Sequence, residues 1–256
     1  MLRVIRNLLI RNSSIMKHFT RKISLFLFVL MLNELSKGRK NSQLKHFVFA
    51  GISITIAAGF RYESWLIMAI FGLLLLVYKL PKQAIVFSVF ALIFPIIWMY
   101  SNWLATDDPL FGIKGNYNWT HKTMGVNEEL HLKEIIKRIG YFPYSWVLLI
   151  GFPTAFLIVK YGFKIIKEKQ KEKLFWLIPF LLLFGFMIYN SAKGNLLNQH
   201  RFTGTLVVMS LPFFALFFEE FLPKYHNGFT KDYWDYLAYA LGSILFYYSN
   251  RKEEIV

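Results

Sequence analysis

The chain has 256 residues, 55% of them hydrophobic and 18% charged, with a formal net charge of +15 and a mean hydropathy of +0.40. Soluble domains are usually less apolar and more highly charged, so this composition argues against one and predicts an integral membrane protein. Cysteine is absent, which excludes disulfides and thiolate metal sites. The basic residues stand in short blocks between apolar runs, a pattern that encodes membrane topology and argues against nucleic-acid binding.

The N-terminal part of the chain predicts helices with one marked interruption. The first 22 residues are basic, and the short apolar run Ile23–Leu35 that follows is predicted to be retained, because no small-residue cleavage site comes after it. Phe47–Tyr78 is apolar except at Arg61, Tyr62 and Glu63. One straight helix of this length would reach about 48 Å, whereas the hydrocarbon layer is roughly 30 Å thick. We therefore expect a break or hairpin at residues 61–63.

Further apolar segments follow, and most of them contain a proline that is expected to bend the helix. They are Ala84–Leu104 with Pro95, Trp146–Ile166 with Pro153, Leu174–Tyr189 with Pro179, Phe202–Phe221 with Pro212, and Tyr233–Tyr248. The fold class is therefore predicted as all-α, polytopic, with seven or eight transmembrane helices over residues 23–248. A basic segment, 1–22, precedes this domain and a charged tail, 249–256, follows it. We expect a multi-pass protein of the plasma membrane.

The distribution of lysine and arginine predicts the orientation of these helices. Six lysines crowd residues 160–173, which are therefore assigned to the cytoplasmic side, and the basic blocks 37–45 and 79–82 agree with that side. The long connection Ala105–Tyr144 then faces outward, as do Arg61–Glu63 and Lys193–Arg201. Within this connection, apolar residues at helical spacing over 132–139 predict an amphipathic helix, which either lies at the membrane interface or packs on its own loop.

Ionisable groups among apolar spans are costly, so each is a candidate for function. Arg61 can hold an anionic head group through a bidentate contact, or it can pair with Glu63 and cap two half-helices. Asp107 and Asp108, followed by Pro109, can bind a divalent cation or supply a general base, but an Asp–Pro pair equally makes a turn.

A third group of candidates lies at the start of an outward-facing span. Lys193, His200 and Arg201 stand close together in the sequence, before and at the beginning of this span. A cation at such a position can bind a phosphate or extend its side chain to the interface. Both readings stay open at this stage.

Three stretches carry a resemblance to a known family. They are GISITIAAGFRYESWLIMAIFGLLLL (Gly51–Leu76), SNWLATDDPLFGI (Ser101–Ile113) and NQHRFTGTLVVMSLPFFALFFEEF (Asn198–Phe221). They resemble, in this order, elements of GT-C membrane glycosyltransferases, the relatives of dolichyl-phosphate-mannose protein mannosyltransferases. The first resembles a small-residue helix that ends in an Arg-x-Glu-like element, the second a Gly-Asp-Pro-Leu element, and the third a late span that opens with a basic residue.

The resemblance implies transfer of a sugar from a polyprenyl-phosphate carrier to an acceptor on the outer face. It implies lipid-phosphate binding by a basic set, with catalytic acids near the same cavity, and in some members a divalent cation takes part. The basic set is Arg61, His200, Arg201 and Lys193, and the acids are Glu63, Asp107 and Asp108. The expected partners are the lipid bilayer and the lipid-linked sugar, with no nucleic acid and an acceptor that the sequence does not identify.

The chain departs from the family pattern at its N-terminal end. The family's main catalytic acid lies in the first outer loop, whereas the first 22 residues here contain neither Asp nor Glu. The resemblance therefore implies a C-terminal portion of a longer member or a degenerate copy. Two other functions remain open: a transporter or flippase that uses the same intramembrane charges, for which we find no inverted repeat, and a non-catalytic assembly subunit.

Overall fold

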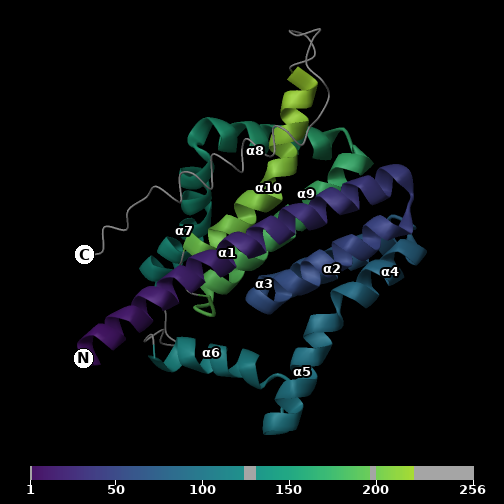
Figure 1. Ribbon diagram of the computed structural model, residues 1–256. Coiled ribbons are helices and arrows are strands. Elements are labelled where there is room, and N and C mark those ends of the chain that lie inside the picture. Colours follow the sequence, from purple (N-terminus) through teal and green to yellow (C-terminus); the bar gives the residue numbers. More distant parts are fainter. Residues whose placement is uncertain (1, 124–130, 197–199, 222–256) are drawn as a thin grey trace. The chain divides into compact units, whose positions relative to one another are not determined.

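The computed structural model describes residues 2–123, 131–196 and 200–221 (Figure 1). Within these ranges every regular element is an α-helix and there is no strand, which confirms the predicted all-α class. The chain forms two compact units, Met1–Met124 and Gly125–Val256, and each is described by itself. The predicted span Tyr233–Tyr248 and the tail 249–256 lie outside the described residues.

Helix α2 is the central helix of the first unit. This unit contains α1 (Leu2–Asn41), α2 (Leu44–Phe60), α3 (Glu63–Val77), α4 (Pro81–Ala91), α5 (Ile93–Thr106) and α6 (Phe111–Thr123). Helix α2 packs against α1, α3, α4 and α5. Helix α1 is continuous through residue 22 and contains the predicted segment Ile23–Leu35.

Small residues on α2 allow the neighbouring helices to approach closely. Ala50, Ala57 and Gly51 are all buried on this helix. A Cβ atom placed on Gly51 would lie 2.7 Å from the carbonyl oxygen of Phe87 on α4, a distance at which one of the two helices would have to shift. Glycine at this position therefore sets the spacing of α2 and α4, as small residues do in membrane helix pairs.

The predicted break and the first predicted kink are both present in this unit. Helix α2 ends at Phe60, Arg61 is extended (φ −149°, ψ 126°), and α3 begins at Glu63. Helices α4 and α5 are bent by 43° at Leu92. Pro95 explains this bend, because it has no N–H to donate to the carbonyl four residues earlier and its ring clashes with that carbonyl. The N–H of Phe94 donates to Thr55 Oγ1 at 2.9 Å, so α2 satisfies a donor at the start of α5.

In its described residues the second unit contains four helices and one sharp bend. They are α7 (Leu132–Ile150), α8 (Phe152–Lys167), α9 (Lys171–Ala192) and α10 (His200–Phe221). Helices α7 and α8 meet at 113°. The single helix predicted over Trp146–Ile166, with a bend at Pro153, is instead divided at Gly151. Gly151 between the helices has φ +82°, which glycine adopts readily, and Pro153 stands in the first turn of α8. The predicted amphipathic segment 132–139 forms the first part of α7.

Aromatic side chains hold α7, α9 and α10 together. The ring of Trp146 on α7 lies 5.6 Å from that of Phe180 on α9, and Phe180 lies 5.9 Å from Phe213 on α10. Trp146 Nε1 donates to Ser210 Oγ at 3.3 Å. A buried indole N–H needs such a partner, so this hydrogen bond fixes which side of α10 faces α7.

Apolar helix length supports association with a membrane. Among the described residues α9 is long and apolar enough to cross a bilayer, and the bent pairs α4–α5 and α7–α8 bring the number to three if each pair is one span. Helices α2 and α3 and the stretch Phe202–Phe213 are apolar but shorter.

Candidate functional site

The break between α2 and α3 holds a bidentate ion pair. Arg61 Nη2 donates to Glu63 Oε1 at 3.0 Å, and Arg61 Nε donates to Glu63 Oε2 at 3.4 Å. The two side chains are only 9% and 13% exposed. The extended backbone of Arg61 places its guanidinium beside the first turn of α3, where a carboxylate also favours the helix dipole. The pairing predicted as one of two options for these residues is therefore present.

Three aromatic rings surround this break. The rings of Tyr62 and Trp65 lie 5.9 Å apart, and those of Tyr62 and Trp98 lie 5.8 Å apart. Trp65 and Trp98 lie 5.2 Å apart, and all three contacts are edge-to-face. Trp98 belongs to α5, so these rings, which we call the aromatic trio, join the α2–α3 break to α5. The preference of Trp and Tyr for membrane interfaces fits this position at the end of two apolar helices.

Asp107 and Asp108 form the turn between α5 and α6. Asp107 ends α5 in the left-handed conformation, with φ 57°. Asp108 Oδ1 accepts the backbone N–H of Leu110 at 3.0 Å, and its Oδ2 accepts Lys114 Nζ at 2.7 Å. The hydrogen bond from Lys114, followed by that from the Leu110 N–H, holds the pKa of the Asp108 carboxyl below its usual range. The turn predicted as one option here is present, and Asp108 is the residue that stabilises it.

Glycine brings this turn back toward the aromatic trio. A Cβ atom placed on Gly112, at the start of α6, would lie 2.5 Å from the ring of Trp98. Residues from the α2–α3 break, from α5 and from α6 therefore meet at one end of the first unit. Arg61 and Glu63 lie at this end beside Tyr62. The Asp108 turn, between α5 and α6, is linked to it by the contact of Gly112 with Trp98.

The other predicted phosphate-binding residues belong to the second unit. Lys193 is the exposed residue that ends α9. Helix α10 begins with His200 and Arg201, whose side chains lie outside the described part of the structure. A joint site for Arg61 and Arg201 therefore stays a prediction. Over the ranges that the structure describes, no three His, Asp or Glu side chains gather to hold a metal ion.

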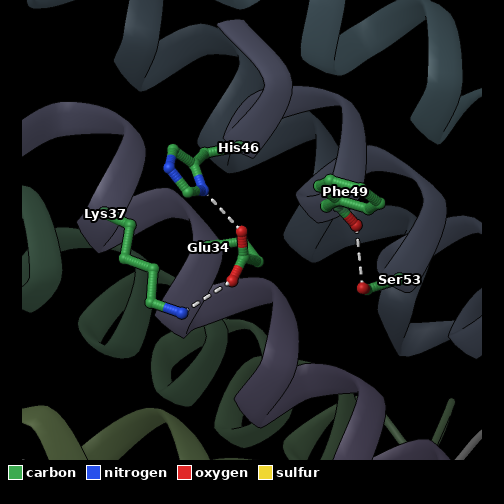
Figure 2. Close-up of polar contacts among 5 residues, drawn as sticks. All are labelled: Glu34, Lys37, His46, Phe49 and Ser53. Carbon is green, nitrogen blue, oxygen red and sulfur yellow. Dashed lines mark hydrogen bonds and ion pairs between the residues drawn. The ribbon is translucent and has the colours of Figure 1, made fainter. Parts of the chain in front are cut away.

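A charged cluster between α1 and α2, centred on the buried Glu34, was not predicted from the sequence. Figure 2 shows Glu34 on α1 between Lys37 and His46. His46 Nδ1 lies 2.7 Å from Glu34 Oε2, and Lys37 Nζ lies 3.1 Å from Glu34 Oε1. The Glu34 and His46 side chains are 11% and 14% exposed. A carboxylate near the end of the apolar run Ile23–Leu35 was the available signal, because such a group needs a partner.

No protein-family model matches the chain, and no curated protein or solved structure is similar to it. The resemblance to GT-C glycosyltransferases therefore depends on three stretches of sequence alone, Gly51–Leu76, Ser101–Ile113 and Asn198–Phe221. Two of them, Gly51–Leu76 and Ser101–Ile113, lie within the first unit.

Proposed function

We propose that the chain is a GT-C-like membrane glycosyltransferase, which transfers a sugar from a polyprenyl-phosphate carrier to an acceptor on the outer membrane face. The observation that carries this proposal is the bidentate guanidinium of Arg61, held by Glu63 at a helix break beside the aromatic trio, of which Tyr62 is exposed. Arginine is suited to phosphate because its planar fork makes two parallel hydrogen bonds. A lipid phosphate needs such a group at the membrane surface, where the sugar is within reach of water-soluble acceptors.

The proposed membrane arrangement contains seven or eight crossings. The segment Ile23–Leu35 of α1, helices α2 and α3, the bent pairs α4–α5 and α7–α8, and helices α9 and α10 supply seven, and residues 233–248 are the eighth. Helix α2 has 17 residues and is about 25 Å long, so the bilayer must thin locally around it. The outward side then carries the aromatic trio, the Asp108 turn and the start of α10.

In the proposed reaction Arg61 exchanges one partner for another. The lipid phosphate takes up the N–H donors that Glu63 accepts in this structure, and the Glu63 carboxylate is released. This carboxylate removes the proton of the acceptor hydroxyl, whose oxygen attacks the anomeric carbon. The bond from that carbon to the phosphate oxygen breaks, and Arg61 stabilises the phosphate that leaves. Asp107 and Asp108 are the alternative candidates for the carboxylate that removes this proton. Asp108 already forms an ion pair with Lys114.

Binding of a polyprenyl-phosphate sugar to the full chain tests this function. Arg61→Ala should weaken donor binding at least tenfold, because a charge-assisted bidentate contact contributes more than about 1.4 kcal/mol. Lys160→Ala, which removes an exposed positive charge on α8 outside the proposed sites, is the control and should leave donor binding unchanged. Glu63→Gln should retain donor binding and lose transfer. Unchanged affinity of Arg61→Ala for the donor would contradict the proposal.

The burial of the ion pair also favours a second reading, a non-catalytic assembly subunit. In that case Arg61 and Glu63 only neutralise each other at the break. Removing Arg61 alone would leave a largely buried carboxylate without its main partner and would destabilise the fold, whereas removing both would cost much less. An Arg61→Ala/Glu63→Ala variant that regains stability but still fails to bind the donor favours the glycosyltransferase. If Arg61→Ala and Arg61→Ala/Glu63→Ala change only the stability and leave donor affinity unaltered, the assembly subunit is favoured.

A further inference from the structure

Two basic turns meet at the end of the first unit that is opposite to Arg61. One turn joins α1 to α2 over residues 42–43, and the other joins α3 to α4 over residues 78–80. The guanidinium carbon of Arg39 lies 5.3 Å from the ring centroid of Tyr78, a cation–π contact between the end of α1 and the end of α3. Helices α2 and α3 run from this end to the break at Arg61. The contact therefore shows that two segments far apart in the sequence form one surface.

This surface, which we call the basic end, is strongly cationic. Its basic residues are Lys37, Arg39, Lys40, Lys45, Lys79 and Lys82. Residues 36–46 and 78–83 contain no Asp or Glu. The nearest carboxylate in the sequence, Glu34, is engaged by Lys37 and His46 inside the α1–α2 pair. It therefore does not neutralise Lys40, Lys45, Lys79 and Lys82, which are exposed.

The helices that begin at the basic end add to its positive potential. Helix α2 begins at Leu44 and α4 at Pro81, and neither has an acidic residue in its first turn or a side-chain cap. Uncapped N–H groups at a helix N-terminus favour anions. They supplement the lysines, which supply most of the charge.

Exposed apolar side chains stand directly beside these lysines. Leu76 and Val77, just before Lys79, are 50% and 72% exposed, and Ile85, just after Lys82, is 63% exposed. An apolar helix surface bordered by lysines matches the boundary between the acyl chains and the headgroups of a bilayer. A soluble anion would satisfy the lysines but not this apolar border, so the combination points to lipid.

We propose that the basic end is a binding surface for anionic phospholipids of the inner leaflet. The lysines contact the lipid phosphates, and the apolar residues next to them contact the acyl chains. The Arg39–Tyr78 contact holds the two turns at the spacing that lets both reach one cluster of headgroups. This surface serves to fix the orientation and depth of the first unit, whether or not the chain is a glycosyltransferase.

Lipid binding by the full purified chain, measured by native mass spectrometry, tests this surface. The chain should retain phosphatidylglycerol in preference to phosphatidylcholine. Lys79→Gln/Lys82→Gln should lower the affinity for phosphatidylglycerol by about 25-fold, since each lysine near a lipid surface contributes roughly a factor of five. Lys133→Gln/Lys137→Gln on α7 removes the same charge elsewhere and should have little effect.

Three results would overturn the proposal. The first is equal affinity of the Lys79→Gln/Lys82→Gln variant and the unaltered chain for phosphatidylglycerol. The second is an equal loss in the Lys133→Gln/Lys137→Gln control, which would show that only net charge matters. The third is full displacement of phosphatidylglycerol by millimolar inorganic phosphate, which would assign the surface to a soluble anion.

Discussion

Replacement of His46 by leucine should loosen the attachment of α1 to α2. This change removes the donor that lies 2.7 Å from Glu34 Oε2 and leaves the carboxylate with Lys37. Because the Glu34 and His46 side chains are 11% and 14% exposed, water replaces the lost partner poorly. A hydrogen bond to a charged group contributes about 1.5–3 kcal/mol. At about 2–4 °C per kcal/mol for a chain of this size, the midpoint of unfolding should fall by about 3–12 °C.

Thermal unfolding of the full chain in detergent micelles, followed by circular dichroism, measures this effect. Glu34→Gln and the double variant complete a cycle from which the coupling between the two side chains is obtained. Lys37→Gln is the control: the Lys37 side chain is 45% exposed, so water can replace much of its contact with Glu34 and a smaller fall is expected. A fall for His46→Leu no larger than that for Lys37→Gln would refute the reasoning.

Two further predictions concern helix spacing and the α5–α6 turn. Gly51→Ala should destabilise the chain by about 1–3 kcal/mol, because the new Cβ would clash with the backbone of Phe87. Gly185→Ala is the control in the same unfolding assay. It has open space around it and should stabilise the chain by about 0.5–1 kcal/mol. Lys114→Met should raise the pKa of Asp108 toward its ordinary value, measured by carboxyl carbon NMR. Because the fold lowers the pKa of Asp108, its carboxylate stabilises the turn at any pH above its ordinary pKa. This stabilisation is lost as the pH falls through the lowered pKa. An unchanged pKa of Asp108 in Lys114→Met would contradict the role of Lys114.

Elements whose ends are set by local chemistry were predictable from the sequence. The interruption of an apolar run by Arg61, Tyr62 and Glu63 gave the α2–α3 break, because the run was too long for one span. Pro95 gave the bend between α4 and α5. Gly151 and Pro153 form a stronger stop than a proline kink, since the chain turns by 113° where Gly151 adopts φ +82°. Pro153 alone predicts one bent helix at this position, whereas the structure has two helices.

Contacts between helices were less predictable, because they depend on which helix faces align. The residue types of Arg61 and Glu63 suggested their pairing, since the two lie two positions apart. The pairing of Glu34 with His46 depends on the length of α1 and on the turn at residues 42–43, which together bring the two side chains level. The contact of Arg39 with Tyr78 depends in the same way on where α1, α2 and α3 end. Neither contact has a spacing in the sequence that identifies it.

The most direct test of the account is the sidedness of the first unit, because the proposed function requires Arg61 to face outward and the basic end to face inward. The chain contains no cysteine, so single-cysteine variants need no background changes. Lys40→Cys and Ala105→Cys, both at exposed positions, can be treated with a membrane-impermeant maleimide in right-side-out and inverted vesicles. We expect Ala105→Cys to react only in right-side-out vesicles and Lys40→Cys only in inverted ones. Reaction of both variants from the same side would contradict the account.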